Sequence, residues 1–366
     1  MKATVIGGAM IDTIAIIDSD RIEKMSMANA DSTFLLLEAG RKIDAREVST
    51  HTGGGAVNVA VALARLGNEV TIIAKVGRDE RAAMISARLA SEGISTDAIC
   101  SADDQPTGAS VLIASHDKDA AIFTYRGANV TLTAADIPSA RLASRLVYVA
   151  PLSDNAAEAY AFIVETAKSN GAFVAVNPGI RQISARGQKF RDTLSFVDLL
   201  ILNRKEAEGL VPLLVAEFGD QGKLADGSDV QNPPRLFLSG LSGGGYDFSL
   251  VGFLSAITRA GTKAIAITDS SRGSYVATPG NVWHCPAAAR TVAGTAGAGD
   301  AFGATLACEL ARGAGVEDAL RPATSNAASV VGHVDTQTGL QSRAALAAAV
   351  AADRKNLEVR HWTMTL

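Results

Sequence analysis

Short runs of β-branched residues alternate with alanine-rich stretches of helical period along most of this 366-residue chain. Parallel strands cannot be joined by a tight hairpin and need a crossover segment, usually a helix, so this alternation is typical of βαβ units. It predicts an α/β fold in which helices connect the strands of a mostly parallel sheet. The expected strands span residues 3–6, 70–75, 146–149, 172–177, 199–202 and 264–268. The expected helices span residues 58–66, 80–92, 155–170, 249–259, 301–311, 316–331 and 343–352.

Three segments depart from this alternation. Around residues 13–50 and 111–126, strand-like stretches follow one another with no helix between them, which predicts one small antiparallel β-sheet built from two chain segments. A sheet that projects from an α/β core serves as a lid or as an oligomer surface. Residues 211–247 combine many glycines and prolines with little periodicity, so we expect a long surface insertion there. No repeat or linker divides the chain, which we interpret as a single domain over residues 1–366.

Composition excludes several classes of partner. The chain has 34 Lys and Arg against 38 Asp and Glu, a net charge of −4, and no basic block, so nucleic acid is not expected as a partner. No uncharged apolar stretch approaches the roughly 18 residues of a membrane span, so no membrane association is expected. The three cysteines, Cys100, Cys285 and Cys308, lack a CxxC spacing, which argues against a disulfide framework and a zinc site. We therefore expect a cytoplasmic protein.

The densest cluster of small residues runs from Gly294 to Asp300 and leads directly into an apolar helical stretch. Small residues let a backbone approach a ligand closely, and the first turn of a helix offers unpaired N–H groups at the positive end of its dipole. This combination predicts an anion site. Asp300 would lie in that first turn, where its carboxylate could accept a proton from a hydroxyl beside a bound phosphate. Alternatively, Asp300 only caps a tightly packed helix start.

A second glycine cluster, residues 53–55, precedes Asn58 and another predicted helix. Backbone can approach a ligand there too, and the Asn58 amide offers both a donor and an acceptor to a polyol. The alternative is a tight strand-to-helix turn without a ligand. The spacing is not that of a dinucleotide-binding fingerprint, and the glycines at 243–245 precede no Lys-Ser or Lys-Thr pair, which excludes a P-loop.

Three further polar residues follow predicted strands. Asp12 follows the first strand, at the carboxyl edge where open α/β sheets bind ligands, although an aspartate is also common in turns. Asn203 and Glu206 follow the strand at 199–202 with a spacing of three, which suits a hydrated Mg²⁺ and equally suits a helix cap. The five histidines pair with no acid at metal spacing, so we expect no metal site from them.

Taken together, these motifs resemble those of the ribokinase-like, or PfkB, family of carbohydrate kinases. The two motifs typical of that family have counterparts at 53–67 and 295–300, and between them lie family-like strings at 75–79 and 126–129 and the Asn203 and Glu206 pair. The resemblance covers nearly the whole chain, and five elements in the family's order are more specific than any one of them. It implies a ribokinase-like three-layer αβα core with a mostly parallel sheet and a small antiparallel β lid.

The resemblance also implies an activity, transfer of the γ-phosphoryl group of ATP to a hydroxymethyl group of a small sugar. Asp300 would be the general base, and the backbone N–H groups of Gly297, Ala298 and Gly299 would form the anion hole for the moving phosphoryl group. Phosphoryl transfer needs alignment and charge stabilisation more than covalent help, so this assignment is chemically consistent.

The resemblance also implies binding roles for further residues of this chain. Substrate contacts are expected from Asp12, Gly54, Gly55 and Asn58. Nucleotide contacts are expected from Asn203, Thr268, Gly273 and Asn326. Glu206 would organise Mg²⁺ through water.

The chain also departs from the family pattern. Gly294 stands where relatives usually have an aspartate that helps to bind a monovalent cation, so we expect little dependence on K⁺. Residues 150–152 read Ala-Pro-Leu where ribokinase has a sugar-binding glutamate, which weakens the case for ribose. Water would compete for the phosphoryl group in an open site, so the lid is expected to close over the sugar, and homodimerisation through the lid is expected.

Two alternatives stay open at this point. A nucleoside kinase of the same fold would use the lid and the insertion to accommodate a base, and nothing in the pocket residues excludes it. The second alternative is a ligand-binding protein that kept the fold without turnover. Retention of Asp300 beside a glycine-rich anion hole argues against that alternative, because a pure binder needs no base there.

Overall fold

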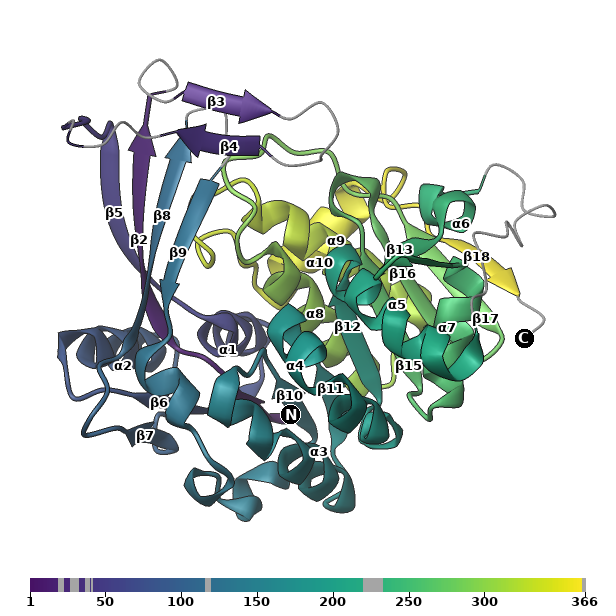
Figure 1. Ribbon diagram of the computed structural model, residues 1–366, viewed down its shortest axis with the longest axis horizontal. Helices are drawn as coiled ribbons and strands as arrows, with labels where there is room; N and C mark the ends of the chain where they lie inside the picture. The colour runs from purple at the N-terminus through teal and green to yellow at the C-terminus, as the bar shows by residue number, and fades with distance from the viewer. Residues whose placement is uncertain are drawn as a thin grey trace.

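The structure, a computed structural model, describes residues 1–18, 23–26, 33–36, 40, 42–115, 120–219 and 233–363. One large sheet runs through the protein (Figure 1). Its strand order is β18 (Arg360–Thr363), β17 (Asn281–Cys285), β16 (Ser274–Thr278), β15 (Ala264–Thr268), β12 (Leu199–Asn203), β11 (Phe173–Val176), β10 (Leu146–Val149), β1 (Lys2–Ile6), β6 (Glu69–Val76) and β7 (Ile99–Ser101). Neighbours from β15 to β7 pair in parallel, whereas β16, β17 and β18 extend the sheet by antiparallel pairing.

Helices cover both faces of this sheet, and strand side chains alternate between two apolar cores. In β1, Val5 belongs to one core and Ile6 to the other. Because both faces are covered, β10 is buried at every position, which explains the continuous apolar runs in the sequence. The first core contains residues of α1 (Gly55–Arg65), α2 (Glu80–Ser91), α8 (Ala298–Ala311), α9 (Val316–Val330) and α10 (Arg343–Ala352). The second contains residues of α3 (Tyr160–Ser169), α4 (Gly179–Asp192), α5 (Arg204–Phe218), α6 (Arg235–Ser239) and α7 (Leu250–Arg259). The predicted three-layer αβα fold is confirmed.

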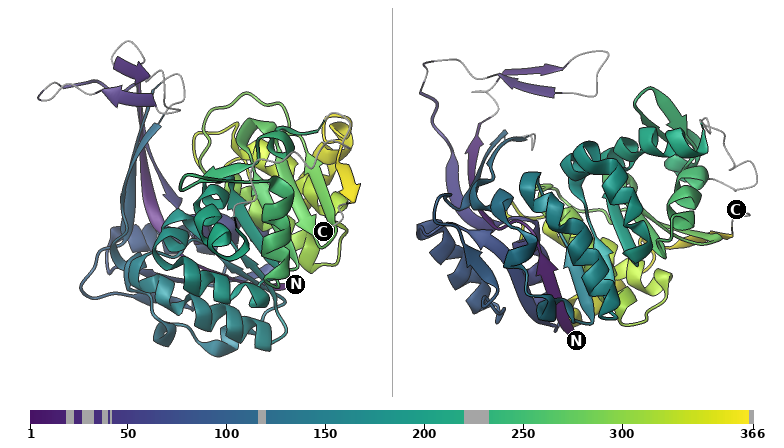
Figure 2. Two further views of the ribbon diagram at one scale, coloured as in Figure 1. Left: turned by 45° about the vertical axis from the view of Figure 1, so that its right-hand side comes forward. Right: turned by 60° about the horizontal axis from the view of Figure 1, so that its bottom comes forward.

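A smaller sheet rises from the core on one side (Figure 2). Its order is β5 (Glu47–Gly53), β2 (Met10–Ile17), β8 (Gly108–Ser115) and β9 (Ala120–Tyr125). The two outer pairs are antiparallel, and the central pair β2–β8 is parallel. A hairpin of β3 (Glu23–Ser26) and β4 (Thr33–Leu36) lies at the far end of the small sheet (Figure 1). Residues 19–22, 27–32, 37–39 and 41 of the predicted lid segment 13–50, and residues 116–119 of the segment 111–126, lie outside the described residues.

The segment expected to be a long surface insertion, 211–247, differs from that prediction at both ends. Residues 211–218 complete α5, which contains Pro212 in its interior. After residues 220–232, which lie outside the described residues, α6 is followed by the hairpin of β13 (Leu241–Gly243) and β14 (Tyr246–Phe248). A Cβ atom at Gly244 would lie 2.6 Å from Pro212 Cγ, so the hairpin packs directly on α5. The glycines and proline that suggest an irregular loop are therefore contact points between two regular elements.

Short 3₁₀ turns connect several of these elements. They are η2 (Gly127–Thr131), η3 (Ala134–Asp136), η4 (Ser139–Leu142), η5 (Asp154–Ala159), η6 (Leu194–Phe196) and η7 (Ser270–Arg272). Helix α1 begins at Gly55, three residues before the expected start at 58, and α8 begins at Ala298 rather than at 301. As a result, the glycine clusters of the two predicted ligand sites lie at the first turns of α1 and α8.

Candidate active site

The large sheet brings the predicted site residues to one edge. After β1 the chain adds β6 and β7 on one side of this strand and later adds β10 on its other side, so the direction of strand addition switches at β1. Open α/β sheets bind ligands at such a point, outside the carboxyl ends of the strands. Gly8 follows β1 there, and its carbonyl accepts the N–H of Ala56 at the start of α1 over 3.1 Å. Gly54 has φ 92°, and a Cβ atom there would lie 2.9 Å from the Gly8 carbonyl carbon, so only glycine allows this contact.

The first turn of α8 contains the glycines of the predicted anion site. Its N-cap, Gly297, has the left-handed φ of 78°, and a Cβ atom there would lie 2.7 Å from Thr336 Cβ, so a glycine is required. The first N–H groups of a helix have no intrahelical acceptor, and they point outwards together with the positive end of the helix dipole. A Cβ atom at Gly299 would meet no atom within 4 Å, so the space above this turn is open. The predicted anion site therefore has a geometry that fits a phosphate group.

Asp300 lies in this first turn and is partly exposed. Asn58 Nδ2 donates a hydrogen bond to Asp300 Oδ2 over 2.8 Å. The other oxygen, Oδ1, lies 3.7 Å from the position that a Cβ atom of Gly55 would occupy. Burial raises the pKa of Asp300 to about 6, the Asn58 hydrogen bond opposes this rise, and the negative charges of Glu206 and Asp12 add to it. A carboxylate with a pKa of about 6 is still mostly ionised at pH 7 and is a stronger base than an exposed aspartate.

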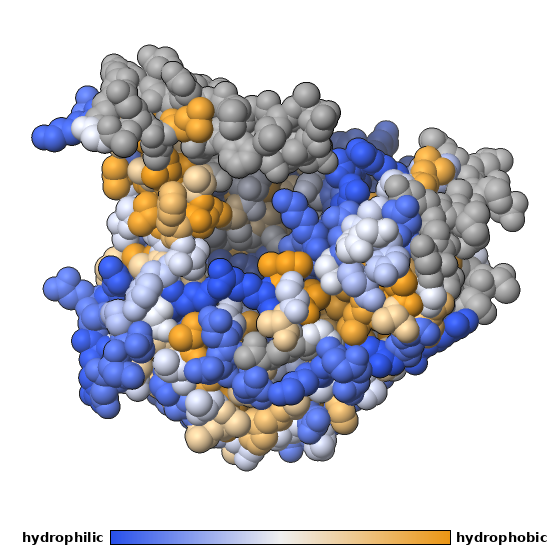
Figure 3. Space-filling model, viewed as in Figure 1, coloured by the Kyte–Doolittle hydropathy of each residue, from blue (hydrophilic) through white to orange (hydrophobic). Residues whose placement is uncertain are grey.

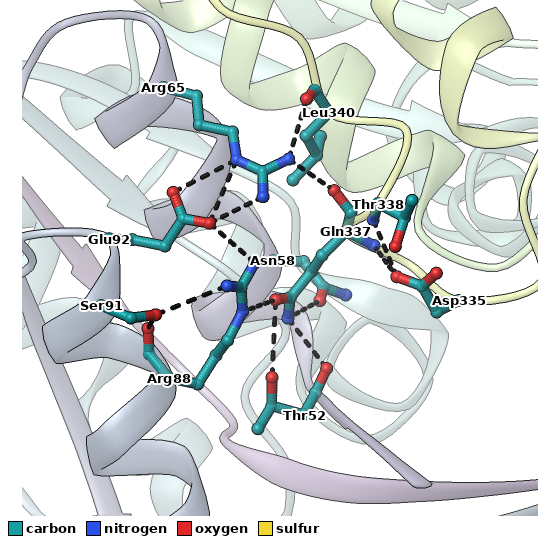
Figure 4. Close-up of polar contacts among 10 residues, drawn as sticks. All are labelled: Thr52, Asn58, Arg65, Arg88, Ser91, Glu92, Asp335, Gln337, Thr338 and Leu340. Carbon is teal, nitrogen blue, oxygen red and sulfur yellow. Dashed lines mark hydrogen bonds and ion pairs between the residues drawn. The ribbon is translucent and has the colours of Figure 1, made fainter. Parts of the chain in front are cut away.

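The Asn58 amide has one orientation because its oxygen is already occupied by two donors, of which Figure 4 shows Gln337. Thr336 Oγ1 donates to Asn58 Oδ1 over 2.8 Å, and Gln337 Nε2 donates to the same oxygen over 3.2 Å. With its oxygen facing two donors, the amide must present its NH₂ group to Asp300. The sequence interpretation missed both Thr336 and Gln337, because neither belongs to a local motif.

Gln337 is itself held by three other elements (Figure 4). Its Nε2 donates to the Thr52 carbonyl of β5 over 2.8 Å, and its Oε1 accepts from Arg88 Nε of α2 over 3.0 Å. Arg65 of α1 donates from Nη1 to the Gln337 carbonyl over 2.8 Å. Both arginines also pair with Glu92, each at 2.7 Å. The contacts of Asn58 with Asp300 are thus part of a network that joins α1, α2, β5 and the loop after α9.

A cavity of about 100 Å³ lies beside Asp300, where the surface is hollowed beneath the small sheet (Figure 3). Gly55 lines it, and Asp300 Oδ1 lies 3.7 Å from the position that a Cβ atom of Gly55 would occupy. Met10 of β2 and Asn129 line the side towards the small sheet, and Pro151 lines the side towards β10. The cavity thus combines a carboxylate at its border with walls from both the core and the small sheet, which is the usual construction of a small-molecule site.

Asp12 lies on β2 of the small sheet, next to Gly53. Ser110 Oγ of the neighbouring strand β8 donates a short hydrogen bond to Asp12 Oδ1. Burial raises the pKa of Asp12, while Ser110 and His51 act in the opposite direction. Asp12 therefore presents a half-buried carboxylate near Asp300, as an acceptor for hydroxyl groups would require.

Asn203 and Glu206 form the helix cap that was one of the two sequence interpretations. Asn203 Oδ1 accepts the Glu206 N–H over 2.9 Å, and Glu206 Oε2 accepts the Asn203 N–H over 2.8 Å. Asn177 Nδ2 also donates to Glu206 Oε2 over 3.3 Å. Burial raises the pKa of Glu206. Within the described ranges no group of three or more His, Cys, Asp or Glu side chains could hold a metal, so a Mg²⁺ ion would need oxygen ligands from nucleotide phosphates and water as well as from Glu206.

The predicted nucleotide positions are only partly brought to this edge. Thr268 ends β15, beside the end of β12. Gly273 has φ 100° and packs against the Cys285 carbonyl and Pro286, so the close approach of β17 requires this glycine. Asn326 is fully buried in α9, where its Nδ2 donates to Thr305 Oγ1 over 2.9 Å and its Oδ1 accepts the Gln341 N–H over 3.1 Å. In this conformation Asn326 holds the protein interior together and does not join the other site residues.

Solved structures show which class of protein has this fold. Ribokinase from Arabidopsis thaliana, complexed with ribose and ATP, is 20% identical, matches 95% of this chain and 98% of its own, and has a TM-score of 0.69. Adenosine kinase from Sinorhizobium meliloti is 21% identical, matches 97% of this chain and 99% of its own, and has a TM-score of 0.70. The fold is therefore that of the ribokinase-like kinases.

Comparison of the sequence with known families shows the family to which the chain belongs. The model of the pfkB family carbohydrate kinases matches residues 12–222 and 250–343, and the chain belongs to this family of phosphotransferases with an alcohol acceptor. Ribokinase from Staphylococcus aureus is 25% identical over 78% of this chain and 84% of that protein. The bifunctional ribokinase/ribose-5-phosphate isomerase A from Fructilactobacillus sanfranciscensis is 26% identical over 71% of this chain, which spans 42% of that relative's length. The predicted family is confirmed. Among the described helices, none is long and apolar enough to cross a membrane.

Proposed function

We propose that this chain is an ATP-dependent sugar kinase that transfers the γ-phosphoryl group to a hydroxymethyl group of a small carbohydrate. The observation that carries the proposal is the position of Asp300. Its carboxylate lies in the first turn of α8, where Gly299 faces open space, and one of its oxygens lies beside Gly55, which lines the cavity. An acceptor hydroxyl in this cavity would lie between the base and the phosphoryl donor, as in-line transfer requires.

Asp300 Oδ1 is the oxygen that accepts the proton of the acceptor hydroxyl. The other oxygen is engaged by Asn58, so the orientation of the carboxylate is fixed before the acceptor arrives. ATP supplies the phosphoryl group when it is bound. The backbone N–H groups of Gly297, Ala298 and Gly299 stabilise the charge that develops on that group, because they point at one site and need no reorganisation. Asp12, Gly54 and Gly55 orient the hydroxyl groups of the acceptor.

Asn58 acts on the base in this proposal rather than on the sugar. Both atoms of its amide are engaged within the protein, with Thr336 and Gln337 on the oxygen and Asp300 on the nitrogen. Glu206 has a buried carboxylate that fits a water ligand of Mg²⁺ beside the phosphates, with Asn203 and Thr268 at neighbouring strand ends.

The test is Asp300→Asn, assayed with Mg-ATP and a panel of ketoses, aldoses, sugar acids and nucleosides while ADP release is followed. We expect ATP binding to stay nearly unchanged and turnover to fall by at least about 100-fold, the usual loss for a general base. Turnover equal to that of the parent would remove Asp300 from the mechanism.

A nucleoside kinase is the second candidate, favoured by the fold shared with the adenosine kinase from Sinorhizobium meliloti. The same panel separates the two candidates. A sugar kinase phosphorylates members of the sugar set with a higher kcat/KM than any nucleoside, and the reverse order would replace the first proposal with the second.

A further inference from the structure

The cavity beside Asp300 contains a positively charged side chain that the proposed mechanism does not use. Arg126 follows β9 and lines this cavity together with Gly55, whose Cβ position would lie 3.7 Å from Asp300 Oδ1. Arg126 and the residue beside the Asp300 carboxylate, Gly55, therefore line one cavity of about 100 Å³. An acceptor that places its hydroxyl group on Asp300 lies within reach of the guanidinium group.

The backbone at Arg126 is fixed by its neighbours. Asn129 Nδ2 donates to the Arg126 carbonyl over 3.0 Å and to the Ala9 carbonyl over 2.9 Å, while Asn129 Oδ1 accepts the Ala9 N–H over 2.8 Å. The N–H of Ala128 donates to the Pro106 carbonyl over 2.8 Å. These bonds tie the Arg126 turn to the loop after β1, so the side chain starts from a defined position at the cavity wall.

In the described part of the chain the guanidinium group of Arg126 makes no hydrogen bond or ion pair, although the negative charge of Asp154 acts on it from a distance. Arg126 is half-buried, and every other residue lining the cavity is uncharged. Burial lowers the pKa of Arg126, the positive charge of Arg181 lowers it further, and Asp154 opposes both. A half-buried cation beside a second cation is unfavourable without a paired anion, and none of the residues that line the cavity is acidic.

We propose that the acceptor carries an anionic group, a carboxylate or a phosphate ester, and that the Arg126 guanidinium binds this group while the hydroxymethyl group of the acceptor faces Asp300. This inference rests on the proposed function and names its substrate class. The planar guanidinium donors match either anion through two parallel hydrogen bonds. A site built around an unpaired charge discriminates against an analogue that lacks the anion, because that analogue leaves the cation buried and unpaired.

Binding is measured first, by calorimetry on the Asp300→Asn protein, so that no turnover interferes. Two pairs of probes differ mainly in the anion: D-gluconate with D-glucitol, and ribose 1-phosphate with methyl riboside. We expect at least one anionic member to bind about 10- to 100-fold more tightly than its neutral partner, the range of a charge-assisted hydrogen-bonded pair. Preference within the first pair identifies a carboxylate, and preference within the second identifies a phosphate ester. Equal binding within both pairs, including no measurable binding of either anion, overturns the proposal.

Arg126→Gln must remove this preference, and Arg126→Lys must retain part of it, because lysine keeps the charge but not the planar donors. The matched control is Arg259→Gln, which removes an exposed arginine from the last turn of α7 and is expected to leave the preference unchanged. In the kinase assay Arg126→Gln raises KM for the anionic acceptor with little change in kcat. An Arg126→Gln protein that instead loses kcat equally for every acceptor would show that Arg126 acts on the moving phosphoryl group, which overturns the proposal. Anion binding that depends on Arg126 without any phosphoryl transfer would disprove the proposed function and leave the anion site standing.

Discussion

Replacement of Asn58 by Ala isolates the contribution of one hydrogen bond to the basicity of Asp300. Asn58 Nδ2 donates to Asp300 Oδ2 over 2.8 Å, and this bond favours the ionised carboxylate against the burial that raises its pKa to about 6. The group has a pKa above its usual value, so activity that depends on ionised Asp300 is present at high pH and is lost as the pH falls through about 6. Removal of the donor moves this loss to higher pH.

The size of the change follows from the type of bond. A hydrogen bond to a charged group contributes about 1.5–3 kcal/mol, which corresponds to about 1–2 pKa units. The acidic limb of the kcat/KM profile should therefore move from about 6 in the parent to about 7–8 in Asn58→Ala. At pH 7 the ionised fraction would fall from about nine-tenths to between about a half and a tenth, and activity should recover near pH 9.

The assay is kcat/KM from pH 5 to 9, with thermal unfolding recorded for each protein. Asn68→Ala is the matched control, because Asn68 is also a buried asparagine, donates to the Leu63 carbonyl over 2.8 Å and lies beside Cys308 rather than Asp300. It should lower the unfolding temperature and leave the acidic limb in place. A limb that stays within about 0.3 units of the parent in Asn58→Ala, or that moves to lower pH, would refute the reasoning, since about 0.3 units is only about 0.4 kcal/mol.

Two further predictions concern other parts of the chain. A Cβ atom at Gly294 would lie 2.9 Å from the His333 carbonyl oxygen, so the position has no room for a cation-binding carboxylate. Kinase rates measured in K⁺ and in choline at equal ionic strength should therefore agree. Strong activation by K⁺ would contradict this prediction. Asp198 is buried, yet Lys168 and Lys263 outweigh burial and hold its pKa below the usual value, so Lys168→Met should destabilise the fold by about 2 kcal/mol at pH 7. The ionised Asp198 carboxylate stabilises the fold above about pH 4, and this contribution is lost on acidification. The difference in unfolding free energy between the parent and Lys168→Met, measured by chemical denaturation, should therefore shrink towards about pH 3. A difference that stays constant would exclude the ion pair as its cause.

The sequence predicts the central fold because strands that are buried on both sheet faces consist of continuous apolar runs. Strands β10 and β12 are short runs of apolar residues, and their bounds agree with the expected ones to within one residue. Helix α4, at Gly179–Asp192, was not expected, because its sequence is mostly polar and carries two glycines. Its stability comes from packing of residues such as Ile183 and Phe190 against the second core, which a local pattern does not reveal.

The site residues also fall into those that a local sequence motif predicts and those that it does not. Asp300 and its glycines form a local motif whose chemistry can be predicted from the order of residues, and the structure places Asp300 in the first turn of α8, as expected. Thr336 and Gln337 cannot be found in this way, because their importance lies in partners 278 and 279 residues away along the chain. Asn326 shows the opposite limit, since a family position suggests a nucleotide contact and the fold buries its amide between α8 and the loop after α9.

The network around Gln337 also determines which part of the small sheet can move relative to the base. Gln337 binds the Thr52 carbonyl, near the carboxyl end of β5, and the Asn58 oxygen that orients Asp300. On the neighbouring strand, the Ala9 backbone before β2 is held by Asn129. The base of β5 is thus tied to Gln337, which also binds the residue that orients Asp300, and a movement there would break several hydrogen bonds. We therefore predict that any closure of the small sheet over an acceptor comes from bending of β2, β5, β8 and β9 beyond these anchors and leaves the geometry of Asp300 intact.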